Sequence, residues 1–251
     1  MNASDPHIEL AAGEVALVGA GPGASDLITA RGARVLAHCD VVVHDSLVDP
    51  SLYACLDCEL IDVGKRAGNH KLPQPEINAL LVRLAKQGKR VVRLKGGDPF
   101  VLGRGSEEAQ FLHAHGVATY VIPGVTSAVA AAELAGIPVT HRGVADAFAV
   151  ISAHPRAEGT PFTIPPFHEK MTVVLLMGVS SLARWREAFS SAGYPASLPV
   201  AFITWAGWPQ QQVRRSTLGQ CLALAEALQA PTVTVVGHVA AIDAKTKSAT
   251  S

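Results

Sequence analysis

The sequence has little charge and few aromatic residues. Of its 251 residues, 17% are charged and 5% are aromatic, and 21 Lys and Arg balance 21 Asp and Glu, so the formal net charge is zero. A neutral chain lacks the overall positive field that attracts nucleic acid, and we therefore expect no nucleic-acid partner. Any anionic ligand must instead bind a local basic patch. The 49% of apolar residues excludes general disorder.

Long apolar runs and a targeting segment are also missing. Because no charge-free run reaches about 18 apolar residues, we expect no membrane-spanning helix and no membrane partner. The N-terminal stretch MNASDPHIELAAGE lacks a basic segment followed by an apolar core, which argues against a secretory signal. The four cysteines are scattered, which predicts reduced thiols and a cytoplasmic location. Cys55 and Cys58 form a C-x-x-C motif without further ligands at zinc spacing, so we expect no metal site.

Short β-branched runs alternate with helical periodicity in the first half of the chain. Alternation of this kind predicts βαβ units and a mainly parallel sheet. The expected strands cover residues 15–18, 41–43, 59–63, 90–94 and 117–122, and the expected helices cover 26–37, 76–87 and 106–115.

The second half repeats the alternation after a break at Pro123-Gly124. Its expected strands cover residues 148–151, 172–176, 200–203, 212–216 and 232–236, and its expected helices cover 125–135, 181–192 and 219–228. We therefore predict an α/β fold with two domains, 14–123 and 124–243, each built on a mainly parallel sheet. We expect an active-site cleft between the domains and flexible tails over 1–13 and 244–251.

Two glycine clusters follow predicted strands. The first is Gly19-Ala20-Gly21-Pro22-Gly23, and the second is Gly96-Gly97-Asp98-Pro99. Each is compatible with an ordinary tight turn. Because ligands bind at the carboxyl ends of strands in open α/β sheets, two such clusters in one parallel sheet favour a shared binding site.

The first cluster also fits a dinucleotide fingerprint, G-x-G-x-x-A, through Gly19, Gly21 and Ala24. Asp45 ends the second predicted strand, where an acid that binds ribose would lie. A nicotinamide- or flavin-dependent oxidoreductase is therefore an alternative. Pro22 argues against it, because it removes a backbone N–H that a pyrophosphate would use.

Basic residues crowd the segment GKRAGNHK, over residues 64–71, without an acid among them. A solvated loop explains such a run, but a rim that binds carboxylates or phosphates explains it equally well. Residues at other predicted strand ends or loops could add to this rim: Arg93, Lys95, Arg104, His141 and Arg142. In a neutral chain, this concentration favours a polyanionic small substrate.

Six segments between residues 15 and 179 together resemble the tetrapyrrole methylase family, and the resemblance covers about residues 15–237. They read VALVGAGPGASDLIT, VVVHDSLV, VGKRAGNHKLPQPEIN, VVRLKGGDPFVLGRGSEE, VIPGVTSAVAAAELAGIPVTHRG and VVLLMGV. The resemblance is strongest to the members that methylate uroporphyrinogen III with S-adenosylmethionine (SAM). It implies two α/β domains, a SAM site in the cleft and a homodimer.

The resemblance also implies roles for single residues. The SAM contacts it implies are Pro22, Gly96, Gly97, Asp98, Val101, Thr126, Ser127, Met177 and Ala206. Val101 stands where the family often has Ile, and the segment 205–209 matches least. Asp45 is implied as the proton acceptor and Lys65 as the proton donor. As clamps for the carboxylates of the substrate we expect Arg66, Lys71, Arg104 and Arg142.

The expected reaction adds methyl groups to C-2 and C-7 of uroporphyrinogen III and gives precorrin-2 by way of precorrin-1, with S-adenosylhomocysteine as the second product. A later methylation of cobalamin synthesis on the same fold is an alternative, and so is a tetrapyrrole carrier that consumes no SAM. Some relatives carry an additional domain that oxidises precorrin-2 and inserts iron. The chain before Val15 is too short for that domain, so we expect another protein to perform those steps.

Overall fold

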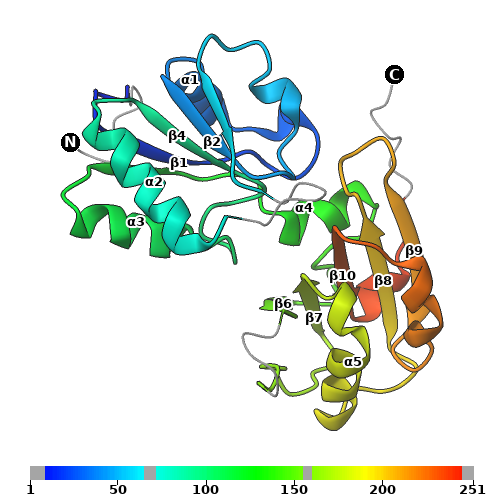
Figure 1. Cartoon of the computed structure of the whole chain (residues 1–251). Helices are drawn as coiled ribbons and strands as arrows, with labels where there is room; N and C mark the ends of the chain where they lie inside the picture. The colour runs from blue at the N-terminus through cyan, green and yellow to red at the C-terminus, as the bar shows by residue number, and fades with distance from the viewer. Residues whose placement is uncertain (1–8, 65–71, 155–159, 245–251) are drawn as a thin grey trace. The chain divides into compact units, whose positions relative to one another are not determined.

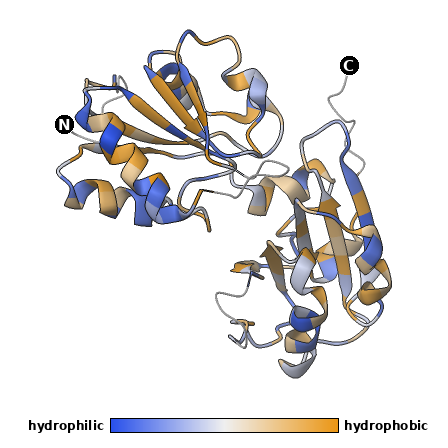
Figure 2. Cartoon of the chain, viewed as in Figure 1, coloured by the Kyte–Doolittle hydropathy of each residue, from blue (hydrophilic) through white to orange (hydrophobic). Residues whose placement is uncertain are grey.

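The computed structural model describes residues 9–64, 72–154 and 160–244 of the chain. The chain divides into two compact units, Met1–Thr126 and Ser127–Ser251, and each unit contains a five-stranded sheet (Figure 1). Figure 2 shows that hydrophobic residues concentrate along the strands of both sheets.

The first unit has the alternation that the sequence predicts. Its strands are β1 (Val15–Gly19), β2 (Val41–His44), β3 (Glu59–Asp62), β4 (Val91–Lys95) and β5 (Thr119–Ile122). Its helices are α1 (Ala30–Leu36), α2 (Gln74–Lys86) and α3 (Gly105–Ala114), with short 3-10 turns η1 (Ser25–Leu27) and η2 (Pro50–Leu52).

All pairings in the first sheet are parallel, in the order β3-β2-β4-β1-β5. Because side chains alternate across a strand, the two faces carry different cores. Val15, Leu17 and Val91 pack under α2 and α3, whereas Ala16, Val18 and Val92 pack under α1 and the segment around Tyr53. The predicted parallel sheet is confirmed for this unit.

The first helix begins later than expected. A helix was expected over 26–37, but the N-cap is Thr29, whose hydroxyl accepts a hydrogen bond from Gly32 N at 3.1 Å. Ile28 and Thr29 have extended backbones, so they separate the turn η1 from α1. The helix expected over 106–115 begins one residue earlier, at Gly105, after Arg104 in a left-handed conformation.

The second unit also contains the predicted strands. They are β6 (Ala147–Ser152), β7 (Met171–Leu176), β8 (Pro199–Thr204), β9 (Gln212–Thr217) and β10 (Thr232–Val236). The helices are α4 (Ser127–Leu134) and α5 (Leu182–Ser191), and the 3-10 segments are η3 (Val179–Ser181), η4 (Cys221–Ala227) and η5 (His238–Ala241). The segment predicted as a helix over 219–228 is therefore mostly a 3-10 helix.

The expectation of a mainly parallel second sheet is wrong. In the order β6-β7-β10-β8-β9, only β6 and β7 run parallel, and the other three pairings are antiparallel. A short loop over 205–211 joins β8 to β9 as a hairpin, which requires antiparallel pairing. β10 inserts between β7 and β8 in the opposite direction to both.

Aromatic residues fill the core of the second unit. Trp185 and Phe189 of α5 are completely buried, and the rings of Phe189 and Tyr194 meet edge-on with centroids 4.6 Å apart. Trp185 Nε1 donates to the Gly178 carbonyl at 2.9 Å, so its polar atom is satisfied inside the core. Across the three described stretches of the chain, none of the helices has the length and apolarity needed to cross a membrane.

Candidate active site

Three glycine-containing turns meet at the carboxyl edge of the first sheet. Gly19 ends β1, Gly97 follows β4 and Gly124 follows β5. A Cβ atom built on Gly19 would lie 2.5 Å from Gly124 Cα and 2.7 Å from the Gly97 carbonyl oxygen. Only glycine permits this contact of three backbones, which explains why the sequence has glycine at the end of each strand.

Backbone hydrogen bonds join the first two turns. Gly97 N donates to Gly21 O at 2.8 Å, and Gly21 N donates to Gly97 O at 3.2 Å. Gly97 has φ +69°, the left-handed conformation that glycine adopts without strain. The two glycine clusters therefore lie against each other at this edge of the sheet.

Asp98 fixes the third turn. One of its carboxylate oxygens accepts from Phe100 N and Val101 N at 2.8 and 3.1 Å, and the other accepts from Gly124 N at 3.0 Å. The Asp98 side chain thus holds the loop after β4 against the turn after β5. Gly96, in contrast, is exposed, and an added Cβ would find only Leu47 Cβ at 3.9 Å. This exposed backbone beside the glycine contact is the surface that a ligand can approach.

Asp45 lies at the same edge, directly after β2. Its Oδ1 accepts a hydrogen bond from Arg93 Nη2 at 2.6 Å. The Asp45 side chain is 34% exposed, whereas that of Arg93 is 2% exposed. A buried guanidinium therefore holds a carboxylate that is partly exposed to solvent. A carboxylate that is fixed and accessible in this way could accept a proton from a bound ligand.

The guanidinium of Arg93 belongs to a buried ionic cluster. Its Nε lies 3.3 Å from Oε1 of Glu108, a residue of α3 whose side chain is completely buried. Lys95 Nζ lies 3.1 Å from Glu108 Oε2, and Gln74 Nε2 donates to Glu108 Oε1 at 3.0 Å. We call Asp45, Arg93, Lys95 and Glu108 the edge cluster. Two cations and two anions make it neutral overall.

The surroundings shift the pKa values of both basic members. Burial works against the charged form of Arg93, but Asp45 and Glu108 outweigh it and raise the pKa of the guanidinium. Burial, together with the charge of Arg93, lowers the pKa of Lys95. The prediction that Arg93 and Lys95 join an exposed basic rim is therefore wrong, because these side chains point into the interior and are paired there.

The sheet order argues against a dinucleotide site. In a dinucleotide fold, the acid that binds ribose follows the strand beside the first strand. Here β4 lies between β1 and β2, and Asp45 is paired with Arg93. The glycine turn is also followed by η1 and an extended segment, so no α-helix begins at the position that would bind pyrophosphate.

In the second unit, two implied SAM contacts lie at one sheet edge. Both β7 and β8 run antiparallel to β10, so the residues that follow them, Met177 and Ala206, lie at the same edge. Met177 and Trp205 adopt positive φ values of 61° and 54°, which non-glycine residues rarely do. Such strain is concentrated at functional sites in proteins.

The remaining predicted residues occupy varied positions. Pro22 is buried in the first glycine turn, and Val101 is partly buried. Ser127 is the first residue of α4, and Thr126 precedes it. Arg104 is exposed and pairs with Glu107 at 2.7 Å. Arg142 is exposed in the turn closed by the bridge between His141 and Ala145. Lys65, Arg66 and Lys71 lie outside the described residues.

Sequence reasoning missed Glu108 and Gln74. Glu108 lies in the first turn of α3, where an acidic residue is ordinary on an exposed face. A signal was available in β4, since Arg93 and Lys95 alternate with apolar residues inside an interior strand. Two cations that point to the same buried face require anions nearby.

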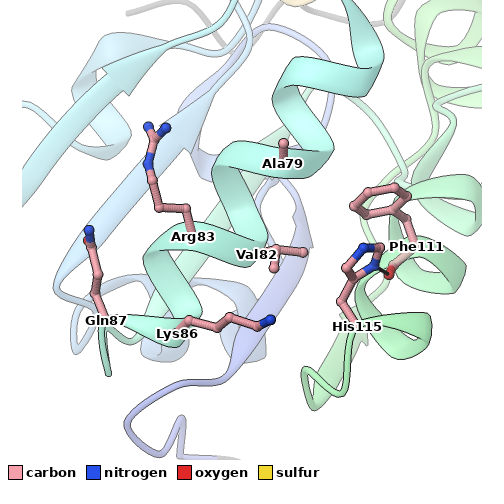
Figure 3. Close-up of a pocket in the computed structure, with 7 residues that line it drawn as sticks. All are labelled: Ala79, Val82, Arg83, Lys86, Gln87, Phe111 and His115. Atoms are coloured by element: carbon pink, nitrogen blue, oxygen red, sulfur yellow. Dashed lines mark hydrogen bonds between the residues drawn. The ribbon is translucent and has the colours of Figure 1, made fainter.

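A separate groove lies between α2 and α3, away from the carboxyl edge of the sheet. Ala79 and Val82 of α2 face Phe111 and His115 of α3 across a space of about 450 Å³ (Figure 3). It lies towards the C-terminal end of α2, where Lys89 O accepts from Gly13 N just before β1 begins. The groove is therefore at the amino end of the sheet, away from the glycine contact.

Comparison with known proteins identifies the family. The model of the tetrapyrrole (corrin/porphyrin) methylases matches residues 14–222. The chain belongs to the tetrapyrrole methylase family. In this chain, the glycine contact and the edge cluster both lie at the carboxyl edge of the first sheet.

Relatives and solved structures agree with this assignment. The chain is 46% identical to the uroporphyrinogen-III C-methyltransferase of Methanocaldococcus jannaschii over 233 residues, which cover 90% of this chain and 96% of that protein. It is 45% identical to the siroheme synthase of Thiobacillus denitrificans, covering 92% of this chain and 49% of that protein. The chain thus spans about half the length of the siroheme synthases that it matches.

The fold has also been solved in a relative. The crystal structure of uroporphyrin-III C-methyl transferase from Thermus thermophilus, complexed with S-adenyl homocysteine, superposes with a TM-score of 0.78 at 37% identity. The match covers 90% of this chain and 98% of that chain. Among the residues described here, His, Cys, Asp and Glu side chains form no group of three or more that could hold a metal ion.

Proposed function

We propose that this chain methylates uroporphyrinogen III at C-2 and C-7 with SAM as the donor, and gives precorrin-2 by way of precorrin-1. The observation that carries the proposal is the contact of Gly19, Gly97 and Gly124 beside Asp45 at one sheet edge. The relative from M. jannaschii, matched over nearly its whole length, supports the choice of substrate.

The exposed backbone at this edge supports a SAM site there. Gly96 leaves open space, and the neighbouring glycines bring the backbone close to that space. The residues that would hold SAM are Pro22, Gly96, Gly97, Asp98, Val101, Thr126, Ser127, Met177 and Ala206. When bound, SAM supplies an electrophilic methyl group on a sulfonium.

The protein itself contributes positioning and proton transfer. A pyrrole carbon of the reduced macrocycle is already nucleophilic, so its alignment with the methyl group is the main requirement. Asp45, held by Arg93, accepts the proton that the macrocycle loses after the methyl group has been added. Lys65 donates a proton. Arg66, Lys71, Arg104 and Arg142 bind the carboxylates of the substrate. Arg104 must exchange its partner Glu107 for a substrate carboxylate to do so.

The protein acts in the cytoplasm as a homodimer. The cysteines support a reducing compartment, because Cys39, Cys55, Cys58 and Cys221 are all free thiols. Cys39 and Cys221 are buried, and burial raises the pKa of the Cys39 thiol to about 12.

Anaerobic incubation with SAM and uroporphyrinogen III, followed by mass spectrometry, tests the proposal. We expect the tetrapyrrole to gain two methyl groups, with two equivalents of S-adenosylhomocysteine formed. SAM binding without methyl transfer would assign the chain to a later tetrapyrrole substrate. Binding of a nicotinamide or flavin dinucleotide in place of SAM would reject the proposal altogether.

A further inference from the structure

We infer that Glu108 is a positioning residue for the methylation: it fixes Arg93, and Arg93 in turn fixes the carboxylate of Asp45. The inference rests on the proposed function, because it gives Asp45 the role of proton acceptor. Glu108 itself lies completely buried and is separated from the exposed edge by Arg93.

The contacts of Arg93 show how the orientation is set. Nε lies 3.3 Å from Glu108 Oε1, and Nη1 donates to the carbonyls of Val43 and Leu94, each at 3.4 Å. These contacts leave Nη2 to meet Asp45 at 2.6 Å. Because a guanidinium is planar, fixing Nε and Nη1 determines where Nη2 points.

Glu108 is itself held from two further elements. Lys95 of β4 contacts both of its oxygens, at 3.2 and 3.1 Å, and Gln74 of α2 donates to Oε1. Gln74 also donates to Asn78 at 2.9 Å, one turn further along α2. The carboxylate of Glu108 therefore connects α2, α3 and β4 to Arg93, which contacts Asp45.

Stability alone is a poor explanation for this cluster. Burying charges costs desolvation, and well-packed apolar residues often stabilise a core as well or better. The cluster also lies at the edge where parallel sheets bind ligands, and it ends in the one member that is substantially exposed, Asp45. A buried arrangement that presents a single carboxylate to this edge points to catalysis.

The backbone of Asp45 is already fixed without Glu108. Its N–H donates to Leu94 O at 3.3 Å, and its carbonyl accepts from Val48 N at 3.2 Å. What Glu108 adds is therefore confined to the orientation and charge environment of the Asp45 side chain. Loss of Glu108 should lower kcat and leave SAM binding intact.

Steady-state kinetics of E108Q and E108A test this. We expect kcat to fall about 10-fold in E108Q and about 100-fold in E108A, the effect of a small misplacement of a reacting group, with KM for SAM within 2-fold of wild type. Glutamine retains the acceptor for Arg93 and should therefore preserve more activity. The control is D40N, which breaks an Asp–Arg pair of equal length at the other end of β4 and should leave kcat unchanged.

A double variant separates positioning from general damage. If Glu108 acts through Asp45, then E108Q should cost almost nothing further in a D45N background, so the two losses are not additive. Multiplying losses, a change confined to KM, or full activity of E108Q and E108A would each overturn the inference. Should E108A fail to fold, E108Q and the double variant still decide the matter.

Crystal structures of the two variants give a readout that does not depend on turnover. In E108A, which removes the acceptor of Arg93 Nε, we expect the guanidinium to rotate and its contact with Asp45 to lengthen beyond hydrogen-bond distance, and in E108Q we expect a smaller displacement. An unchanged pair at 2.6 Å in E108A contradicts the inference even if the variant is slow. If the wild-type enzyme itself methylates no uroporphyrinogen III, the proposed function fails, and these structures still test whether Glu108 orients Arg93.

Discussion

The two ends of β2 and β4 carry similar ion pairs in different surroundings. At the amino end, Asp40 and Arg90 meet at 2.6 Å with side chains 31% and 41% exposed. At the carboxyl end, Asp45 and Arg93 meet at the same distance, but Arg93 is buried and bound to Glu108. Equal distances thus accompany different surroundings, and burial together with a second carboxylate distinguishes the end at which we propose the active site.

Removing the arginine at each end should give the largest contrast. R93L leaves Glu108 buried with only Lys95 as a counter-charge, and breaking a buried pair in this way costs about 3–5 kcal/mol. R90L removes an exposed pair, which contributes little in water. Urea unfolding at pH 7 measures both. A change of similar size in the two variants would show that burial of the edge cluster has no energetic consequence.

Glycine substitutions sharpen the comparison at the level of the backbone. G19A places a methyl group against two neighbouring backbones, and we expect a loss of about 2–3 kcal/mol in the free energy of unfolding. Gly88, near the amino end, has φ +76° and no atom within 4 Å of an added Cβ. G88A should therefore cost only the conformational strain, about 1 kcal/mol.

SAM binding separates these two glycine variants further. G19A should weaken SAM binding measured by calorimetry, because the contact of the three turns opens. G88A should bind SAM as wild type does. Equal SAM affinities in the two variants would show that the glycine contact does not shape the binding surface.

The strands and glycine turns were predictable from sequence, whereas the pairing of the second sheet was not. Alternating strands and helices indicate parallel pairing only when each connection is a packed crossover helix. The loop over 205–211 is too short for one, and η4 takes the place of the helix predicted over 219–228. The spacing between the strands at 200–203 and 212–216 could have indicated the hairpin.

The sequence could predict those parts of the candidate site that lie in the turns after strands. Gly19, Gly97 and Asp45 follow strands, and parallel strands bring such positions to one edge. Glu108 could not be assigned in this way, because its partner Arg93 is 15 residues away and their contact depends on how α3 packs on the sheet. Contacts that depend only on tertiary packing leave no local sequence pattern from which they could be predicted.

A smaller effect of pH on the free energy of unfolding is expected from the pair of Asp40 and Arg90 at the amino end of the sheet. Hydrogen bonds from Arg90 lower the pKa of Asp40 from 3.8 to about 2. A carboxylate with a lowered pKa stabilises the fold above the unfolded-state value and loses that contribution as the pH falls through the folded-state value. D40N should therefore be slightly less stable than wild type at pH 7, with the difference shrinking between pH 4 and pH 2. A difference that stays constant over this range would contradict the assignment.

The central claim is that Asp45 at the carboxyl edge performs proton transfer while the glycine turns bind SAM. Single-turnover methyl transfer by D45N, with S-adenosylhomocysteine affinity measured in parallel, tests it most directly. We predict that the rate falls by about 100-fold or more and that the affinity is unchanged, because Asp45 acts only after the cofactor is bound. A D45N enzyme that methylates uroporphyrinogen III at the wild-type rate would contradict the account.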